Sequence, residues 1–448
     1  MSKVAVSFDG GAPFAVPLGQ CEGDPVKEFP IDSSLLFAAD GQIYFGSLAV
    51  RKSLEVHGSP QRRLDSLKRW LTTGEQSELD QVSLPRAFNQ TGTEFSLADA
   101  IALMFAHILR LTHDYLRGQY GDELLDNVVY RFTRPVFGPD RGRWVDQQMT
   151  GAIAAGLQLE RRLGTSYTGS IDAGLARKLL DALSPKAASL RCISPQGVLE
   201  PVAAGILVLS QVPNRRFLAA IMDIGAGTTD IALFAGIQPD GLPTVDRVHT
   251  HGIPVSVTKA GDYIDGLLAK IIEEGAQDRL TARDHIEIEL NIRRWKEDIF
   301  KFQEAIPTLS GGRRLARITL HIFTRVRGFQ AMQQELIDSL FGVLRSAEEI
   351  IDSYATLMAP PLFRPVDNIE IIPCGGGANL PVFREIAGRY WESWPSGRRL
   401  GFDVQKPIPA DGNYDESFPQ LAVALGGALR DQPVVNGPAP SRPTRGRY

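Results

Sequence analysis

Residues 221–234, IMDIGAGTTDIALF, set polar and glycine residues between two apolar, strand-like runs. The expected hairpin carries two acids at its tip, Asp223 and Asp230, with two threonines between them. Gly225 and Gly227 permit a positive φ and let backbone N–H groups approach a ligand closely. Carboxylate and hydroxyl oxygens are hard ligands of the kind that magnesium prefers. The stretch therefore predicts a site for a magnesium–phosphate group rather than a bare turn.

A second glycine turn lies far along the chain, at Cys374–Pro381 in CGGGANLP, between a strand and the start of a helix. By itself, a triple glycine is explained as well by tight packing of a strand on a helix as by a ligand. Its place in a longer order is more informative. Six features follow one another along the chain: an acid–proline helix, the hairpin, a Gly-Asp helix, an Arg- and Lys-rich helix, this turn and a small-residue helix.

Hydrophobic periodicity predicts the elements that must position these motifs. In the first half we expect strands at 3–8, 13–19, 33–39, 42–49 and 127–137, and helices at 62–74, 96–121, 140–164 and 197–210. Ser96 is the expected N-cap of the longest of these helices. Residues 165–190 have a weaker pattern and are predicted to be an inserted excursion with one helix.

The second half alternates helices and strands around the two glycine turns. We expect helices at 262–275, 284–305, 330–358 and 418–431, a strand at 314–324, and a strand–turn–helix unit at 368–388. Residues 432–448 are Pro-rich and basic, which predicts a disordered tail.

Composition excludes several classes of protein. The 448 residues can form two or more globular units, and 43% apolar with 22% charged residues is ordinary for a folded soluble chain. A net charge of −4 gives no electrostatic case for binding nucleic acid or a membrane. The three cysteines form no CxxC pair, and no apolar run is long enough to span a bilayer. We therefore expect a cytoplasmic protein.

The succession of motifs resembles the actin-like ATPase superfamily, and most closely the nucleotide-binding domain of the seventy-kilodalton heat-shock chaperones. The resemblance covers nearly all of residues 3–431. DIGAGTTD looks like the family's second phosphate loop and CGGGANLP like its adenosine loop, while LEPVAAG (199–205) and AVALGGAL (422–429) look like the two connecting helices. It implies an α/β fold with two lobes, each a ribonuclease-H-like mixed sheet flanked by helices, and a nucleotide cleft between them.

The resemblance also implies a division of the chain. It places lobe I at 1–212 with an inserted subdomain at about 32–124, lobe II at 213–410 with an insert at about 251–332, a C-terminal helix that returns to lobe I at 411–431, and the tail at 432–448.

Roles at the phosphate end of the ligand follow from the same resemblance. Asp223 would hold hydrated Mg²⁺, and Thr228 with the backbone of Gly225, Ala226 and Gly227 would hold the β- and γ-phosphates of ATP or ADP, with Thr229 also counted in the site. Asp230 would fix the tip or orient water, Glu200 would assist the attacking water, and Lys68 would reach the γ-phosphate. From the residues alone, the two aspartates could cap a hairpin, Lys68 could lie on a solvated face, and Glu200 could be a helix N-terminal acid.

At the other end of the ligand, Lys296 with Arg293 or Glu297 would flank the adenosine. Gly375, Gly376 and Gly377 would lie against the purine and ribose, and Gly261 at the start of the Gly-Asp helix completes the set. Asn379 stands where the family usually has an arginine that stacks on adenine, which puts the affinity for adenine in question.

The start of the chain departs from the family, which opens with a strand and a first phosphate loop. VAVSFDGGAPFAVPLG matches the sequence that follows that loop, so we favour an alignment in which the loop is absent. In a second alignment, SFDGG is a degenerate loop with Asp9 as its acid, although Ala12 and Pro13 replace its hydroxyl residues. Either the recorded start lies downstream of the real one, or the protein binds nucleotide with half a phosphate clamp and hydrolyses it slowly or not at all.

The predicted function is nucleotide-dependent lobe closure with slow or partner-dependent ATP hydrolysis. A catalytically inactive, nucleotide-sensing scaffold that acts through a protein partner is the second alternative, and a filament-forming actin relative is the third. About seventeen residues follow the last helix, which is too few for a peptide-binding domain, so a substrate-holding chaperone is not expected.

Overall fold

The structure is a computed structural model with a mixed α/β architecture. It describes residues 1–9, 11–55, 61–65, 67, 83–163, 167, 169–184, 192–209, 216–237, 248–276, 280–310, 312–356, 366–392, 397–405, 414 and 417–429. The tail at 432–448 lies outside the described residues. Every helix in the described ranges is too short or too polar to cross a lipid bilayer.

The largest sheet has six strands in the order β10-β9-β8-β13-β15-β14. These are β8 (Arg216–Ile224), β9 (Thr229–Ile237), β10 (Val248–Val257), β13 (Asn368–Cys374), β14 (Tyr390–Glu392) and β15 (Arg399–Val404). β13 runs parallel to both β8 and β15, while the other neighbours are antiparallel. The central strands are almost wholly apolar because both faces of the sheet are covered.

Helices cover this sheet and form a first hydrophobic core with it. They are α9 (Gly261–Gly275), α10 (Ala282–Phe302), α12 (Arg327–Ser346), α13 (Glu348–Thr356) and α14 (Val382–Ala387). The core joins one face of β8 and β9 to the apolar faces of α9, α10 and α12. Thr281 begins α10 with a reciprocal capping box to Asp284.

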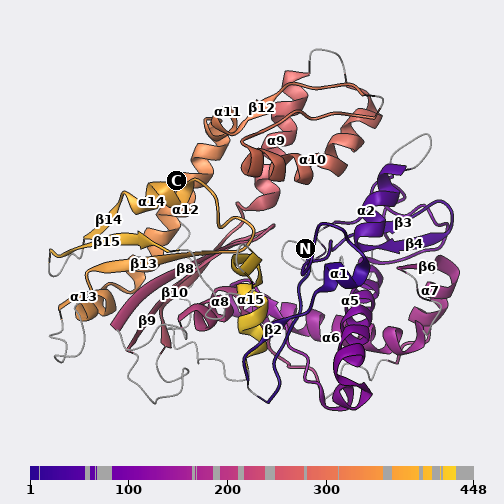
Figure 1. Ribbon diagram of the computed structural model, residues 1–448, viewed down its shortest axis with the longest axis horizontal. Coiled ribbons are helices and arrows are strands. Elements are labelled where there is room, and N and C mark those ends of the chain that lie inside the picture. Colours follow the sequence, from indigo (N-terminus) through magenta and orange to yellow (C-terminus); the bar gives the residue numbers. More distant parts are fainter. Residues whose placement is uncertain are drawn as a thin grey trace.

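A second core holds the N-terminal elements together. It lies among a three-stranded sheet, β3 (Leu35–Phe37), β4 (Gln42–Phe45) and β6 (Ser170–Asp172), and the helices α1 (Leu18–Glu22), α2 (Gly46–Glu55), α5 (Leu97–Tyr120), α6 (Pro139–Leu163) and α7 (Ala173–Asp181). Ser96 caps α5 as predicted, with a capping box to Asp99. Figure 1 shows these elements on one side of the molecule and the six-stranded sheet on the other.

The third core lies where the two groups of elements meet. Helices α8 (Glu200–Leu209) and α15 (Phe418–Ala428) pack against each other and on the six-stranded sheet. Two small strand pairs adjoin them: β1 (Ala5–Val6) with β2 (Phe14–Ala15), and β5 (Thr133–Arg134) with β7 (Val198–Leu199). The last helix therefore contacts elements of the first half of the chain, and Figure 1 shows it in the middle of the molecule.

Several predicted elements differ from the structure. Residues 314–324 contain only a short strand, β12 (Ile318–Thr319), paired with β11 (Glu304–Ala305) and followed by a helical turn, α11 (Leu320–Thr324). The predicted strand at 127–137 begins with a 3-10 turn, η1 (Asp122–Asn127), and only β5 is regular strand. Residues 42–49 change from strand to helix at Gly46, and the 330–358 helix is interrupted at Ala347.

Candidate functional site

The two glycine turns lie side by side. β8 and β13 are parallel neighbours in the sheet, with Asp223 opposite Cys374, so both turns leave the sheet at the same edge. The Gly377 N–H donates to the carbonyl oxygen of Ile224 at 3.0 Å and ties one turn to the other. Segments about 150 residues apart in sequence thus form one continuous surface.

Two of the three glycines in the second turn are required by packing. Gly375 has φ +75°, and a Cβ added there would lie 2.4 Å from Oδ1 of Asp223. A Cβ on Gly377 would lie 2.4 Å from Cγ2 of Ile224. At Gly376 no atom lies within 4 Å of such a Cβ, so this residue faces open space. The triple glycine therefore combines close packing of the two turns with one open position.

Gly375→Ala is expected to destabilise the fold, because the methyl group would displace the Asp223 carboxylate and force a left-handed φ on alanine. We expect a loss of about 1–3 kcal/mol in the free energy of unfolding. Gly376→Ala, in the same turn, is the matched control and should unfold close to the parent, because its added Cβ meets no atom within 4 Å. Urea denaturation measures both variants. Equal behaviour of the two variants would contradict the packing described for Gly375.

The first turn is held by helix α9. The Gly225 N–H closes the turn on the carbonyl of Thr228 at 2.9 Å. From α9, the Gly261 N–H donates to the Gly225 carbonyl at 3.1 Å and the Asp262 N–H to the Ala226 carbonyl at 2.7 Å. The helix N-terminus is thereby joined to the turn and adds a favourable field for an anion.

Backbone N–H groups remain available at both turns. Within the described part of the chain, the N–H groups of Ala226, Gly227 and Gly376 donate to no other group. Ala226 and Gly376 are exposed, and Gly227 is partly exposed. Successive N–H groups that point into a cavity are suited to binding phosphate oxygens.

A cavity of about 1810 Å³ opens over both turns. Its lining contains most of the predicted site residues: Glu200, Asp223, Gly225, Ala226, Gly227, Thr228, Gly261, Arg293, Lys296, Glu297, Gly375, Gly376, Gly377 and Asn379. Glu200 and Asp223 are both buried, each with 5% of its surface exposed. The structure thus brings together residues from α8, the hairpin, α9, α10 and the second turn.

Thr229 and Asp230 do not line the cavity, which corrects their assignment as ligand contacts. Thr229 turns away and its Oγ1 donates to the carbonyl of Lys259 at 3.1 Å. Asp230 is fully buried and accepts from the Val136 N–H at 2.9 Å and from Oγ1 of Thr228 at 2.8 Å. Asp230 is thereby bonded to the Val136 backbone and to the Thr228 hydroxyl at the tip of the hairpin, and its role toward a ligand stays a prediction.

Helix α10 adds positive charge to the cavity wall. Nζ of Lys296 lies 2.7 Å from Oδ1 of Asp265 and donates to the carbonyl of Gly261 at 3.2 Å. Arg293 lies 3.8 Å from the carboxylate of Asp262. Burial alone lowers the pKa of Arg293, but the surrounding carboxylates outweigh it and raise the pKa above its usual value. Arg293 is therefore charged, and the side chains of both residues are held beside acidic partners.

No group of three or more His, Cys, Asp and Glu side chains that could bind a metal occurs in the described ranges. Mg²⁺ keeps several waters and is usually bound by one or two carboxylates together with phosphates, which fits Asp223 beside the free N–H groups.

The Cys374 thiol lies opposite Asp223 in the sheet. Burial raises the pKa of this thiol well above its usual value, and the Asp223 charge raises it further, so the thiol is neutral.

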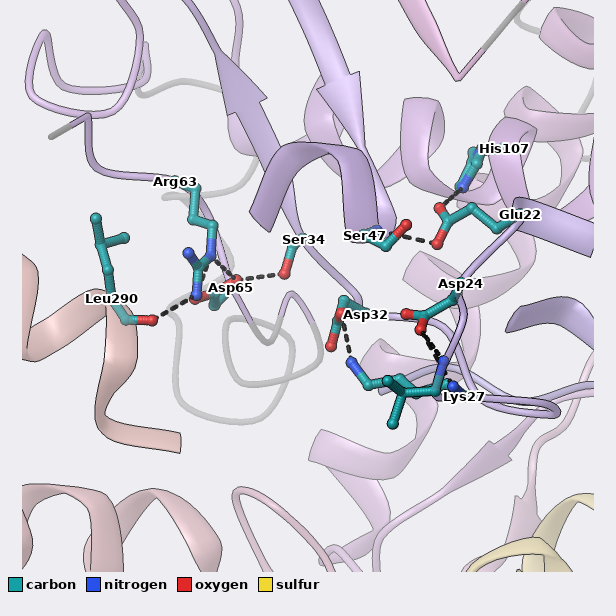
Figure 2. Close-up of polar contacts among 11 residues, drawn as sticks. Glu22, Asp24, Lys27, Asp32, Ser34, Ser47, Arg63, Asp65, His107 and Leu290 are labelled. Atoms are coloured by element: carbon teal, nitrogen blue, oxygen red, sulfur yellow. Dashed lines mark hydrogen bonds and ion pairs between the residues drawn. The ribbon is translucent and has the colours of Figure 1, made fainter. Parts of the chain in front are cut away.

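Contacts between distant parts of the chain connect the N-terminal elements to α10. Nη2 of Arg63 donates to the carbonyl of Leu290 on α10 at 3.0 Å, and Figure 2 shows this contact together with the Asp65 carboxylate that holds the guanidinium. Next to it, Nε of Arg62 lies 3.1 Å from Oε2 of Glu289. Two successive arginines thus join the N-terminal elements to α10.

The turn between β1 and β2 also faces the cavity. Ser7, Phe8 and Asp9 line it, and Oγ of Ser7 donates to the carbonyl of Gly11 at 2.8 Å. Asp9 has φ +48°, a conformation that aspartate tolerates in turns. Both alignments of this stretch with the family stay predictions.

Two residues that hold the first turn were not predicted from the sequence, and one predicted site residue lies outside the described part of the chain. Asp262 follows Gly261 at a helix start, a recognisable signal for a residue that braces the turn. Val136 acts through its backbone N–H, which leaves no trace in the side-chain pattern. Lys68, predicted to reach the γ-phosphate, lies outside the described residues.

Comparison with models of known protein families and with curated proteins found no match to this sequence. The functional conclusion therefore depends on the motifs and on the geometry of the cavity.

Proposed function

We propose that this chain is an ATP-binding protein of the actin-like, heat-shock-chaperone type, with two lobes that close on magnesium nucleotide. One observation carries the proposal: two glycine turns with unpaired N–H groups lie side by side, next to a buried aspartate, in one cavity. Turns of this kind bind phosphates, and the acid supplies a ligand for the accompanying cation.

The residues present can be assigned to parts of the ligand. The N–H groups of Ala226 and Gly227 would donate to the β- and γ-phosphates beside Thr228, whose hydroxyl donates to Asp230, and Asp223 would hold the waters of Mg²⁺. Arg293 and Lys296, on the α10 wall, would flank the adenosine with Gly376 below it. When bound, the magnesium ion would neutralise phosphate charge and orient the phosphates.

Hydrolysis in this proposal is slow and depends on a small number of groups. Glu200 is buried in the cavity wall at the start of α8, where a carboxylate can orient a water molecule toward the γ-phosphate. The β1–β2 turn offers Ala12 and Pro13 where a second clamp would need hydroxyl donors. If one loop alone positions the phosphates, the rate of hydrolysis should fall more than the affinity for nucleotide.

Nucleotide would act by biasing lobe closure. The contacts of Arg62 and Arg63 with α10 and of Asp230 with Val136 connect residues of the predicted lobe I to residues of lobe II. A ligand that touches both sides stabilises the arrangement in which these contacts are made. The output is then a change of shape that a protein partner can recognise in the cytoplasm.

An inactive, nucleotide-sensing scaffold is the second candidate. It is favoured by Asn379, which lines the cavity without the planar cation that would stack on adenine, and by the absence of hydroxyl residues at positions 12 and 13. The two candidates share the binding site and differ only in turnover.

Calorimetric titration of the purified chain with ATP and ADP, with and without Mg²⁺, tests the proposal. We expect saturable binding of both nucleotides that is tighter with Mg²⁺. Absence of binding at millimolar nucleotide would refute it. Phosphate release under single-turnover conditions then separates the ATPase from the scaffold.

A further inference from the structure

The α10 wall of the cavity carries an aromatic ring as well as charges. Arg293, Lys296 and Phe300 all line the cavity, and their spacing along the helix places them on one face of α10. Arg293 and Lys296 lie beside Asp262 and Asp265 of α9, close to the first turn. Phe300 follows Lys296 by one helical turn and adds an apolar surface to the same wall.

Phe300 is held in place by two other rings. Its centroid lies 6.2 Å from that of Phe323 on α11, with the planes at 86°, and 6.4 Å from that of Phe329 on α12. Phe323 and Phe329 contact each other at 5.3 Å, and both are fully buried. Phe300 is only partly buried and lines the cavity, so it is the outermost ring of this cluster. A ring that is already fixed loses little freedom when a ligand packs against it.

The other Phe and Tyr side chains of the described lining belong to the first half of the chain. They are Phe8, Phe105, Tyr130 and Phe132. Phe8 packs against Phe14, with centroids 5.5 Å apart, and the Tyr130 hydroxyl is hydrogen-bonded to Nε2 of His113 at 2.9 Å. In the described lining, Phe300 is therefore the ring that shares a wall with the cations of α10.

The second turn has no aromatic ring or guanidinium group of its own. It contributes three glycines, Ala378, Asn379 and Leu380 to the lining. Purine bases are planar, and proteins commonly hold them by stacking them on aromatic side chains or on arginine. Phe300 supplies such a surface from the α10 wall of the same cavity.

We propose that Phe300 stacks on the nucleobase, and that the site therefore accepts purine nucleotides as a class, GTP as well as ATP. Stacking is tolerant of base identity because every base has a π face. The Asn379 amide carries both a donor and an acceptor, so it has a partner on the edge of either purine. This inference rests on the proposed nucleotide function and names its substrate class.

Titration with ATP, GTP and tripolyphosphate, each with Mg²⁺, tests the proposal. Tripolyphosphate has the phosphates without a base, so it reports on the phosphate turns alone. For the unmodified chain we expect saturable binding of all three ligands, with the affinities for ATP and GTP within about tenfold of each other because stacking discriminates weakly.

Phe300→Leu keeps an apolar side chain and removes the ring. We expect the affinity for both nucleotides to fall about tenfold, within the range seen when a stacking ring is removed, and the affinity for tripolyphosphate to stay unchanged. Phe302→Leu is the matched control, because Phe302 lies on the same helix, is 61% exposed and is outside the lining. It should leave all three affinities unchanged.

Thermal melting shows whether each variant is folded. If Phe300→Leu does not fold, Phe300→Trp decides, because it keeps a flat ring at the same position. Its additional indole fluorescence, measured against the unmodified chain, should be quenched by ATP and by GTP but not by tripolyphosphate. Equal fluorescence with and without nucleotide would contradict stacking at this position.

Failure of the inference and failure of the proposed function give different results. If Phe300→Leu binds both nucleotides as tightly as the unmodified chain, or loses tripolyphosphate to the same extent, Phe300 does not stack on the base although the nucleotide site stands. If the unmodified chain binds ATP but not GTP, the assignment to purine nucleotides as a class is wrong. If it binds none of the three ligands, the proposed function is wrong and the inference with it.

Discussion

Asp223→Ala is expected to reduce the affinity for magnesium ATP by about 10- to 100-fold, the range seen when a residue that orients a metal's ligands is removed. Asp223 is buried at the end of β8, beside the phosphate turn and in contact range of the second turn. Without it, the cation loses its only predicted protein carboxylate and the phosphates lose the charge that Mg²⁺ brings. Titration with ATP in the presence and absence of Mg²⁺ measures the effect.

Comparing the affinity for ATP with and without Mg²⁺ shows whether Asp223 holds the metal ion or only packs against the second turn. Asp223→Ala and the parent should differ with Mg²⁺ and converge when the metal is chelated. Glu370→Gln removes another buried acid, on the neighbouring strand β13 and outside the cavity lining, and should leave the magnesium dependence unchanged. An Asp223→Ala protein that keeps the full gain in affinity from Mg²⁺ would show that this residue does not hold the ion.

Gly426→Ala should cause the largest loss of stability, about 3 kcal/mol in the free energy of unfolding and the upper end for overpacking. A Cβ at this position would lie 1.8 Å from the carbonyl oxygen of Ala203 on α8 and 2.4 Å from its carbon. Both atoms are backbone, so no side chain can move aside and the two helices must separate. Urea denaturation measures the change.

The same substitution should also weaken nucleotide binding, because α15 supports the second turn. The Pro419 carbonyl at the start of α15 accepts the Gly375 N–H at 2.8 Å. Gly266→Ala on α9 is the matched control, since no atom lies within 4 Å of its added Cβ and alanine favours the helix by up to ~1 kcal/mol. Similar urea midpoints for the two variants would contradict the close approach of α8 and α15.

Local sequence signals were sufficient where one element's own chemistry decides its structure. The capping residue and the apolar stripe predicted α5 and its N-cap at Ser96. The Asp-x-Gly-x-Gly pattern at residues 223–227 predicted the hairpin of β8 and β9. They failed at 314–324, where β-branched residues favoured a strand. There Oγ1 of Thr319 instead accepts the Ile322 N–H and starts a helical turn.

Long-range pairing explains most of what the sequence could not show. β6, inside the excursion at 165–190, is only three residues long and is stabilised as a strand by pairing with β4, more than 120 residues earlier. At the site, the hairpin pattern could not show that Asp230 turns to the Val136 N–H rather than to a ligand. Which of several polar groups at a turn face a cavity depends on partners that are remote in sequence.

Hydrogen–deuterium exchange with and without magnesium ATP is the most direct test of the central claim that both glycine turns bind one nucleotide. We expect the segments 221–234 and 374–381 to become protected together, at the same ATP concentration, and both protections to shift to higher ATP in the Asp223→Ala protein. Protection of only one segment, or of neither at saturating ATP, would contradict a shared nucleotide site.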